Sequence, residues 1–270
     1  MAETTNTTNA ESNVTIKAPY WGQGTSTLDW CEVTVLLSIF GIYTTVKYNL
    51  GTRYVVAHLA LCSIGIGSWF FHMTLWFEFQ LLDELPMLYA TSVLLYNIYE
   101  IYEKPKYGSL IPFTLFTYAA TVTALYLYNQ EPVFHQVAYA FLVSALHFRS
   151  VYLLQQIENV SLRNQLKFLL FGAAILFGTG FLLWNVDNIA CAQLREARTL
   201  IGKPLAHILE LHGWWHILTA SGSYWWMVYN QYVRIVLLGK SGKQKEWQIS
   251  WVLGVIPYVS RISQIILKNE

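Results

Sequence analysis

The stretch YVVAHLALCSIGIGSWFFHMTL, residues 54–75, contains no Asp, Glu, Lys or Arg. A helix needs about 20 apolar residues to cross the hydrocarbon core of a bilayer, so this stretch is long enough to span one. Six further apolar stretches extend the pattern along the chain. They are residues 33–46, 79–99, 109–128, 132–148, 168–186 and 211–233. The sequence therefore predicts an all-α, integral membrane protein built as a seven-transmembrane-helix bundle.

The composition of the chain supports this class. Hydrophobic residues make up 54% of the chain, charged residues only 12%, and the mean hydropathy is +0.36. Such values are typical of a protein that lies within a bilayer. A formal net charge of +1 offers no basic patch for nucleic acid, so membrane lipids are the expected partners. Because no internal repeat or low-complexity linker divides the chain, we expect one domain over residues 1–270.

The basic residues predict the orientation of the bundle. If the N-terminus lies outside, all but four of the 17 Lys and Arg residues fall on the cytosolic side, as they do in short loops of membrane proteins. The exceptions are Lys17, Arg195, Arg198 and Lys203. We therefore expect a polar lumenal N-terminus (1–28) and a cytosolic C-terminal tail (238–270). Within that tail, residues 247–260 are too few for a span and hold Gly254 and Pro257, which indicates an interfacial or tail element.

This topology predicts where the three cysteines lie. Cys31 and Cys191 fall on the oxidising side, next to the outer ends of two predicted helices, where a disulfide could form. The residues alone leave that pairing open. Cys62 lies in the middle of a predicted helix and is interpreted as a small packing residue.

Polar residues at membrane depth indicate where function lies. An ionisable group persists there mainly when it is paired, metal-bound or catalytic. Three clusters qualify at the outer side of the bundle, and these are Ser68 with His72, Asp83 with Glu84, and His212 with His216. The spacing of His212 and His216 is one helical turn, so both imidazoles project from one face. Together with His72 they form three neutral imidazoles, the set that leaves one open position in catalytic zinc sites.

Each of these residues also has a structural interpretation. A histidine within a membrane can be a hydrogen-bonded packing residue, and Ser68 belongs to a run of small residues that permits close helix packing. Glu84 is interpreted as a charge at a helix start, where the helix dipole favours an acid, which leaves Asp83 as the better candidate for chemistry. The remaining histidines are interpreted as structural or interfacial, and these are His58, His135, His147 and His207.

Several motifs carry a resemblance to a known family. They are GSWFFHMTL (67–75), LLDELPM (81–87), EPVFHQ (131–136), LLWNVDNI (182–189) and HGWWHILTASGSY (212–224). In this order and spacing the chain resembles the alkaline ceramidases, in particular the phytoceramidase type, of the endoplasmic reticulum and Golgi. The resemblance implies hydrolysis of the amide bond of ceramide to sphingosine and a fatty acid in a lipid-accepting cavity.

The resemblance also implies residue roles. It implies zinc ligation by His72, His212 and His216, and it supports the Cys31–Cys191 disulfide. Ser68 and Asp83 are the implied catalytic residues. At a zinc site Asp83 would move a proton from water to the leaving nitrogen, and Ser68 would donate a hydrogen bond to the developing oxyanion.

One departure from the family concerns calcium. Asp29, Trp30 through its carbonyl, and Glu32 match the start of the family's calcium-binding motif, but residues that follow have no counterparts, as if a segment after Glu32 were deleted. Calcium normally takes 6–8 oxygen ligands, so this Ca²⁺ site is incomplete. The alternative is that Asp29 and Glu32 lie in a solvated loop or supply negative charge near a helix start. The same gap explains why the first apolar stretch is short.

Two other functions are compatible with the sequence. One is a seven-helix receptor or lipid-binding protein with a non-catalytic zinc site. The other is a transporter, although no pair of broken helices in matching halves points to one. The hydrolase is preferred because a carboxylate, a hydroxyl and three imidazoles are predicted at one depth.

Overall fold

The computed structural model describes residues 35–239 and 246–262, and it is mostly helical there. The helices are α1 (Leu36–Lys47), α2 (Thr52–Thr74), α3 (Phe77–Tyr99), α4 (Leu110–Asn129), α5 (Pro132–Gln155), α6 (Val160–Ile189), α7 (Cys191–Ile201), the 3-10 helix η1 (Leu205–Leu209) and α8 (Leu211–Leu238). A helix therefore lies at each of the seven apolar stretches. The N-terminal segment 1–28 and the residues Asp29, Trp30, Cys31 and Glu32 lie outside the described residues.

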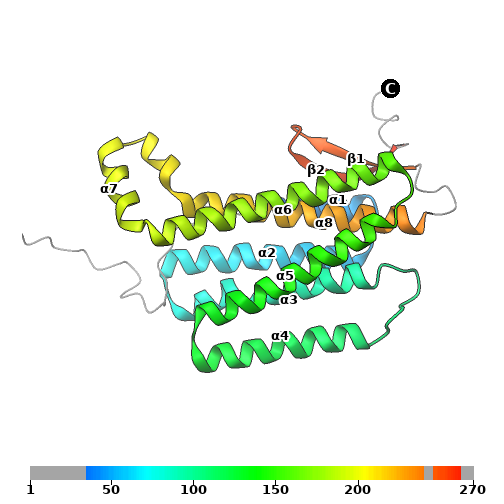
Figure 1. Ribbon diagram of the computed structural model, residues 1–270, viewed down its shortest axis with the longest axis horizontal. Helices are drawn as coiled ribbons and strands as arrows, with labels where there is room; N and C mark the ends of the chain where they lie inside the picture. The colour runs from blue at the N-terminus through cyan, green and yellow to red at the C-terminus, as the bar shows by residue number, and fades with distance from the viewer. Residues whose placement is uncertain (1–34, 240–245, 263–270) are drawn as a thin grey trace, which may run out of the picture.

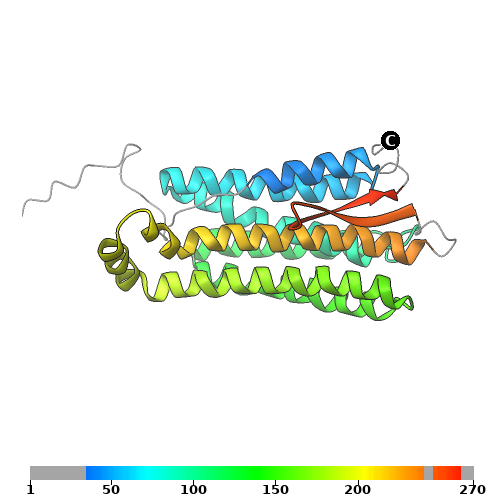
Figure 2. The same cartoon turned by 90° about the horizontal axis from the view of Figure 1, so that it is seen from above.

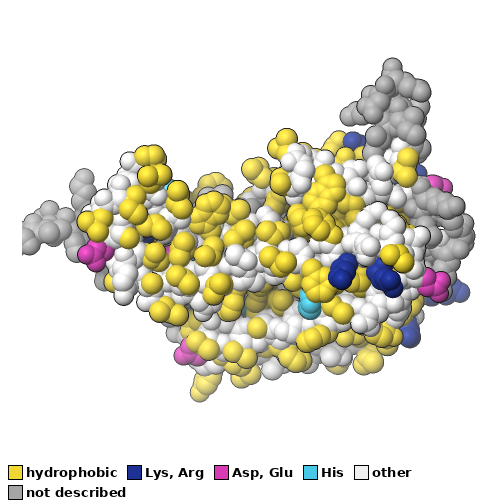
Figure 3. Space-filling model, turned by 45° about the horizontal axis from the view of Figure 1, so that its top comes forward, with side chains coloured by type: hydrophobic (Ala, Val, Ile, Leu, Met, Phe, Trp, Pro, Cys, Tyr) yellow, Lys and Arg dark blue, Asp and Glu magenta, His cyan; other side chains and the backbone are white. Residues whose placement is uncertain are grey.

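The apolar character of these helices is that of a membrane protein. Among the described helices, α2, α4, α5 and α6 are long and apolar enough to cross a bilayer by length and composition. Hydrophobic side chains cover the face seen in Figure 3, and acidic side chains lie toward its two ends. Helix α1 has only 12 residues and would rise about 18 Å, so it is short, as expected from the sequence.

Two helix pairs form the centre of the bundle, α2 with α3 and α6 with α8, and Figures 1 and 2 show all of these helices running lengthwise. Glycine permits both close approaches. A Cβ at Gly222 of α8 would lie 2.8 Å from the Ala173 carbonyl of α6. A Cβ at Gly67 of α2 would overlap the Leu82 carbonyl of α3. Helix α4 packs on α3 and α5 at the edge and buries only Ala119, Val122 and Tyr126.

The C-terminal segment corrects the all-α prediction. Strands β1 (Trp247–Val252) and β2 (Ile256–Arg261) form an antiparallel hairpin, whose turn holds Leu253 and Gly254 at positive φ. The sequence WQISWV alternates apolar and polar residues with the period of a strand, and that is the signal which indicates the hairpin.

The hairpin lies against α1 and α8 (Figure 1). The Tyr224 hydroxyl donates to the Pro257 carbonyl at 2.8 Å, and Trp251 packs edge-on against Trp225. A stretch too short to span is thus held on the bundle as a strand pair, in which each strand pairs the inward-facing backbone groups of the other.

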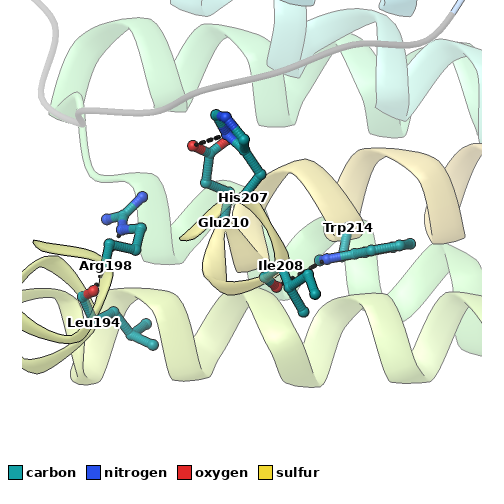
Figure 4. Close-up of polar contacts among 6 residues, drawn as sticks. All are labelled: Leu194, Arg198, His207, Ile208, Glu210 and Trp214. Carbon is teal, nitrogen blue, oxygen red and sulfur yellow. Dashed lines mark hydrogen bonds and ion pairs between the residues drawn. The ribbon is translucent and has the colours of Figure 1, made fainter. Parts of the chain in front are cut away.

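The segment between α6 and α8 folds at the opposite end from the hairpin (Figure 1). Helix α7 has no buried residue and is strongly amphipathic, and Cys191 begins it. The indole of Trp214 donates to the Ile208 carbonyl at 3.1 Å, and His207 pairs with Glu210 at 3.0 Å (Figure 4). These contacts fasten η1 to the first turn of α8, the turn that carries His212.

Candidate active site

Three histidines from two helices converge in the bundle. His72 lies in the last turn of α2, which ends at Thr74 with Leu75 in the left-handed conformation. His212 and His216 lie on the first two turns of α8. The ring centroids are 5.4 Å apart for His72 and His212, 5.3 Å for His72 and His216, and 4.7 Å for His212 and His216. Residues 140 positions apart in sequence thus form one cluster.

The spacing of the ring nitrogens suits one metal ion. One nitrogen from each histidine lies within 4.8 Å of the others, and Nε2 of His212 is 2.8 Å from Nε2 of His216. Tetrahedral zinc with metal–nitrogen bonds of 2.0–2.1 Å sets its ligands about 3.3 Å apart, which falls between these separations. His212 is 5% exposed. The donor set is therefore three largely shielded imidazoles, which zinc prefers.

Ser68 lies one turn before His72 on α2, where this helix packs closely on α3. Pro86 has no N–H to bond the Leu82 carbonyl four residues earlier, and Gly67 lies against that same carbonyl. Ser68 follows Gly67 and Asp83 follows Leu82, so both residues lie at a close contact of the two helices. Ser68 is buried, and its hydroxyl has no hydrogen-bond partner among the described residues. Ser68 therefore lies at a close packing point between helices and also carries an unpaired hydroxyl near the histidines, so its two interpretations are compatible.

A largely apolar cavity adjoins these groups. It holds about 990 Å³ of space free of protein atoms, its open mouth included. Asp83, His72, His212 and His216 all line it. Its aromatic lining is Phe71, Tyr139, Phe177, Phe181, Trp184 and Trp215. Ser68 lines a smaller neighbouring cavity that shares His216, Tyr139 and Trp215 with the first. A cavity that combines these few polar groups with an aromatic lining suits an amphipathic substrate that has a polar group and long hydrocarbon chains.

The structure corrects the interpretation of Glu84. Helix α3 begins at Phe77, so Glu84 lies two turns inside it and the acid of the first turn is Glu78. Glu84 instead accepts hydrogen bonds from the Tyr126 hydroxyl and from the Gln80 amide, the latter at 3.4 Å. It also lines the cavity beside Asp83. Glu84 is therefore part of a buried network within the site.

His135 is the second residue that the sequence interpretation missed. It was assigned to the structural or interfacial histidines, yet it is 2% exposed and lines the same cavity as the other three. The sequence feature that could have placed His135 at the outer end of α5 is Pro132. Proline favours the N1 position of a helix, so His135 falls in the first turn. Its ring stacks on Tyr126 with centroids 5.1 Å apart.

The remaining histidines lie elsewhere. His58 is buried beside Gln231 and Tyr224, His147 packs among Phe148, Phe171 and Trp226, and His207 is exposed in its pair with Glu210. These contacts are with packing residues and a surface acid, and none of the three lines the cavity with the histidine cluster.

Comparisons with known proteins agree with this site. The family model Ceramidase matches residues 33–260. Alkaline ceramidase 3 of Mus musculus is 39% identical over 260 residues, covering 89% of this chain and 94% of that protein. Alkaline ceramidase YPC1 of Saccharomyces cerevisiae is 30% identical over 280 residues (88% and 84%), and the alkaline ceramidase of Arabidopsis thaliana is 25% identical over 261 (89% and 94%).

The chain therefore belongs to the ceramidase family, which is a family of amide hydrolases. The resemblance drawn from the sequence motifs is confirmed, and so is the prediction of an enzyme that acts on an amide bond. The match covers most of the described helices and includes every candidate residue of the cavity.

Proposed function

We propose that this chain hydrolyses the amide bond of ceramide, releasing a sphingoid base and a fatty acid, with a zinc ion held by His72, His212 and His216. The observation that carries the proposal is the convergence of these imidazoles beside Asp83 in one aromatic cavity. Membership of the ceramidase family supports the substrate. A receptor or lipid-binding protein with a non-catalytic zinc site would not need a carboxylate and a hydroxyl beside the metal.

The residues of the chain divide the chemistry between them. Zinc, when bound, lowers the pKa of water and polarises a carbonyl. The Asp83 carboxylate takes up the proton that water loses and returns it to the leaving nitrogen. The Ser68 hydroxyl donates a hydrogen bond to the carbonyl oxygen as negative charge develops there. The aromatic walls, Tyr139 and Trp215 among them, exclude water and hold the two hydrocarbon chains.

The proposal includes the membrane topology and the location of the enzyme. We infer seven membrane-spanning helices, α1 to α6 and α8, with the N-terminus in the lumen of the endoplasmic reticulum or Golgi and the C-terminus in the cytosol. In that topology Cys191 begins α7 on the oxidising side, where Cys31 is its proposed disulfide partner. Asp29, Trp30 and Glu32 would supply part of a calcium site on the same side.

The test measures metal content and turnover on one sample. The purified chain in detergent should contain about one zinc per molecule and should release sphingosine from ceramide, and an alteration of His216→Ala should abolish both. His147→Ala is the control, since His147 packs among aromatic side chains away from the cluster. Zinc without turnover of any ceramide would favour the receptor or lipid-binding alternative, and turnover by a zinc-free chain would refute the metal assignment.

A further inference from the structure

His135 lines the cavity and has one hydrogen-bonding atom that is unused. The side chain is 2% exposed, and its Nε2 atom is buried with no hydrogen-bond partner among the described residues. Leaving a buried polar atom unpaired costs about 1–3 kcal/mol, so a hydrogen bond from a ligand to this atom would be favourable. The cavity beside it is the one lined by Asp83 and by the three clustered histidines.

The neighbours of His135 fix what that atom can do. The imidazole lies within hydrogen-bonding reach of the Glu84 backbone. The Glu84 N–H is used within helix α3, whereas a carbonyl oxygen has a second lone pair, so the imidazole donates and the carbonyl accepts. A neutral imidazole that donates from one nitrogen has a lone pair on the other. Nε2 is therefore an acceptor that needs an O–H or N–H donor.

The ring is also held in place from its face. Tyr126 stacks on it at 5.1 Å and is itself fixed by its hydrogen bonds to Glu84 and from Gln80, the latter at 3.2 Å. Tyr126 and Gln80 are fully buried. Residues of α3 and α4 thus hold the ring of His135 on α5 in one orientation. A residue that only filled space would not need these hydrogen bonds.

We propose that His135 recognises substrate by accepting a hydrogen bond at Nε2 from a hydroxyl group of the sphingoid base, while Tyr126 and Glu84 position its ring. The inference rests on the proposed function for the identity of the ligand and on the described contacts for the identity of the residue. A hydroxyl carries the required hydrogen, whereas a keto or ether oxygen at the same carbon does not. His135 thereby selects substrates by a polar group near the scissile amide.

The test pairs enzyme variants with substrates that lack one hydroxyl. Ceramide, 1-deoxyceramide and 3-ketoceramide are compared by kcat/KM for the wild-type chain, His135→Phe and His135→Gln. Phe keeps the stack on Tyr126 but has no acceptor, and the Gln amide oxygen can reach the position of Nε2. His147→Phe is the matched control, because His147 lies on the same helix outside this cavity.

The expected result is specific to one substrate pair. The wild-type chain should prefer ceramide over one analogue by about three- to tenfold, the range of a single neutral hydrogen bond. His135→Phe should turn over ceramide and that analogue equally, His135→Gln should restore part of the preference, and His147→Phe should retain it. Equal losses on all three substrates, or no loss, would overturn the proposal.

A parallel binding measurement separates this proposal from the hydrolase proposal. Thermal stabilisation by sphingosine is compared with that by 1-deoxysphingosine and 3-ketosphinganine for the same variants. If no ceramide is hydrolysed but the hydroxyl-dependent stabilisation disappears in His135→Phe, the hydrolase proposal fails and the role of His135 stands. If turnover occurs and neither assay shows a hydroxyl preference that depends on His135, the role of His135 fails alone.

Discussion

Histidines lie toward both ends of helix α2, His58 at one end and the cluster of His72, His212 and His216 at the other, and they differ in what surrounds them. His58 is 14 residues before His72, which is about 21 Å along the helix. His58 lies within 3.3 Å of the Gln231 amide, whose nitrogen donates to Thr45, and the Tyr224 ring packs against it. A Cβ at Gly41 would overlap the His58 ring. The inner histidine is therefore closely packed and does not line the cavity.

The outer histidines have convergent nitrogens and open space. His72, His212 and His216 face one another from two helices and line a cavity. Burial alone thus fails to distinguish a functional histidine from a structural one. The distinguishing features are a vacant volume beside the ring and further donors aimed at the same point. Four experiments test that distinction, from the largest expected effect on activity to the smallest.

The largest effect is expected from His72→Ala. One of three imidazoles would be lost, and metal catalysis contributes several kcal/mol, so kcat/KM for ceramide should fall by more than about 10³-fold and zinc content should fall with it. Atomic absorption on the purified variant checks the metal. A variant that keeps its zinc and its activity would place the outer histidines in the same class as His58.

A smaller loss is expected from Ser68→Ala. Removing one oxyanion donor lowers kcat by about 10²–10³-fold in other hydrolases, and the zinc content should stay at the wild-type level. Ser63→Ala is the matched control, since the Ser63 hydroxyl bonds the Ala60 carbonyl of its own helix at 2.7 Å. Should Ser68→Ala lose zinc or stability instead, its role would be packing between α2 and α3.

The inner group should respond in stability and not in chemistry. Gly41→Ala forces a Cβ into the His58 ring, and overpacking of this kind costs about 1–3 kcal/mol. The melting temperature in detergent should fall while zinc per folded molecule stays constant. Gly178→Ala is the control, because nothing lies within 4 Å of a Cβ built at that position. An equal fall in melting temperature for both variants would show that close packing of Gly41 on His58 is not the cause.

The smallest effect on turnover is expected from His58→Asn. The substitution disturbs the contact with Gln231 but leaves the cavity intact, so kcat/KM per folded molecule should change by less than about threefold. Folded protein is quantified by size-exclusion chromatography before the assay. A loss comparable to that of His72→Ala would mean that the two ends of α2 are coupled and that the comparison does not hold.

Much of the fold could be predicted, because the signals are local. The stretch 54–75 contains no charged residue over a length that can cross a bilayer, and helix α2 lies at this position, as predicted. The hairpin was missed because a search for spans discards a stretch as short as 247–260, although WQISWV carries the strand period. Cys31 and the calcium candidates Asp29, Trp30 and Glu32 lie outside the described residues, so their assignments stay predictions.

The site was only partly readable from the sequence. The turn spacing of His212 and His216 indicated a shared face, and the depth of His72 suggested a third ligand. The interpretation of Glu84 as a helix-start charge is wrong, because the helix begins at Phe77 and Glu78 is the acid in its first turn. His135 was missed because a lone histidine has no partner spacing to mark it.

The sequence by itself determined the class of protein, since hydrophobicity and helical period are properties of consecutive residues. Only the tertiary structure decided which polar residues meet. Each of three contacts joins residues from different helices: Gly67 with the Leu82 carbonyl, His135 with Tyr126, and Gly41 with the His58 ring. Such contacts depend on how side-chain volumes fit between helices, and no single stretch of the chain contains that information.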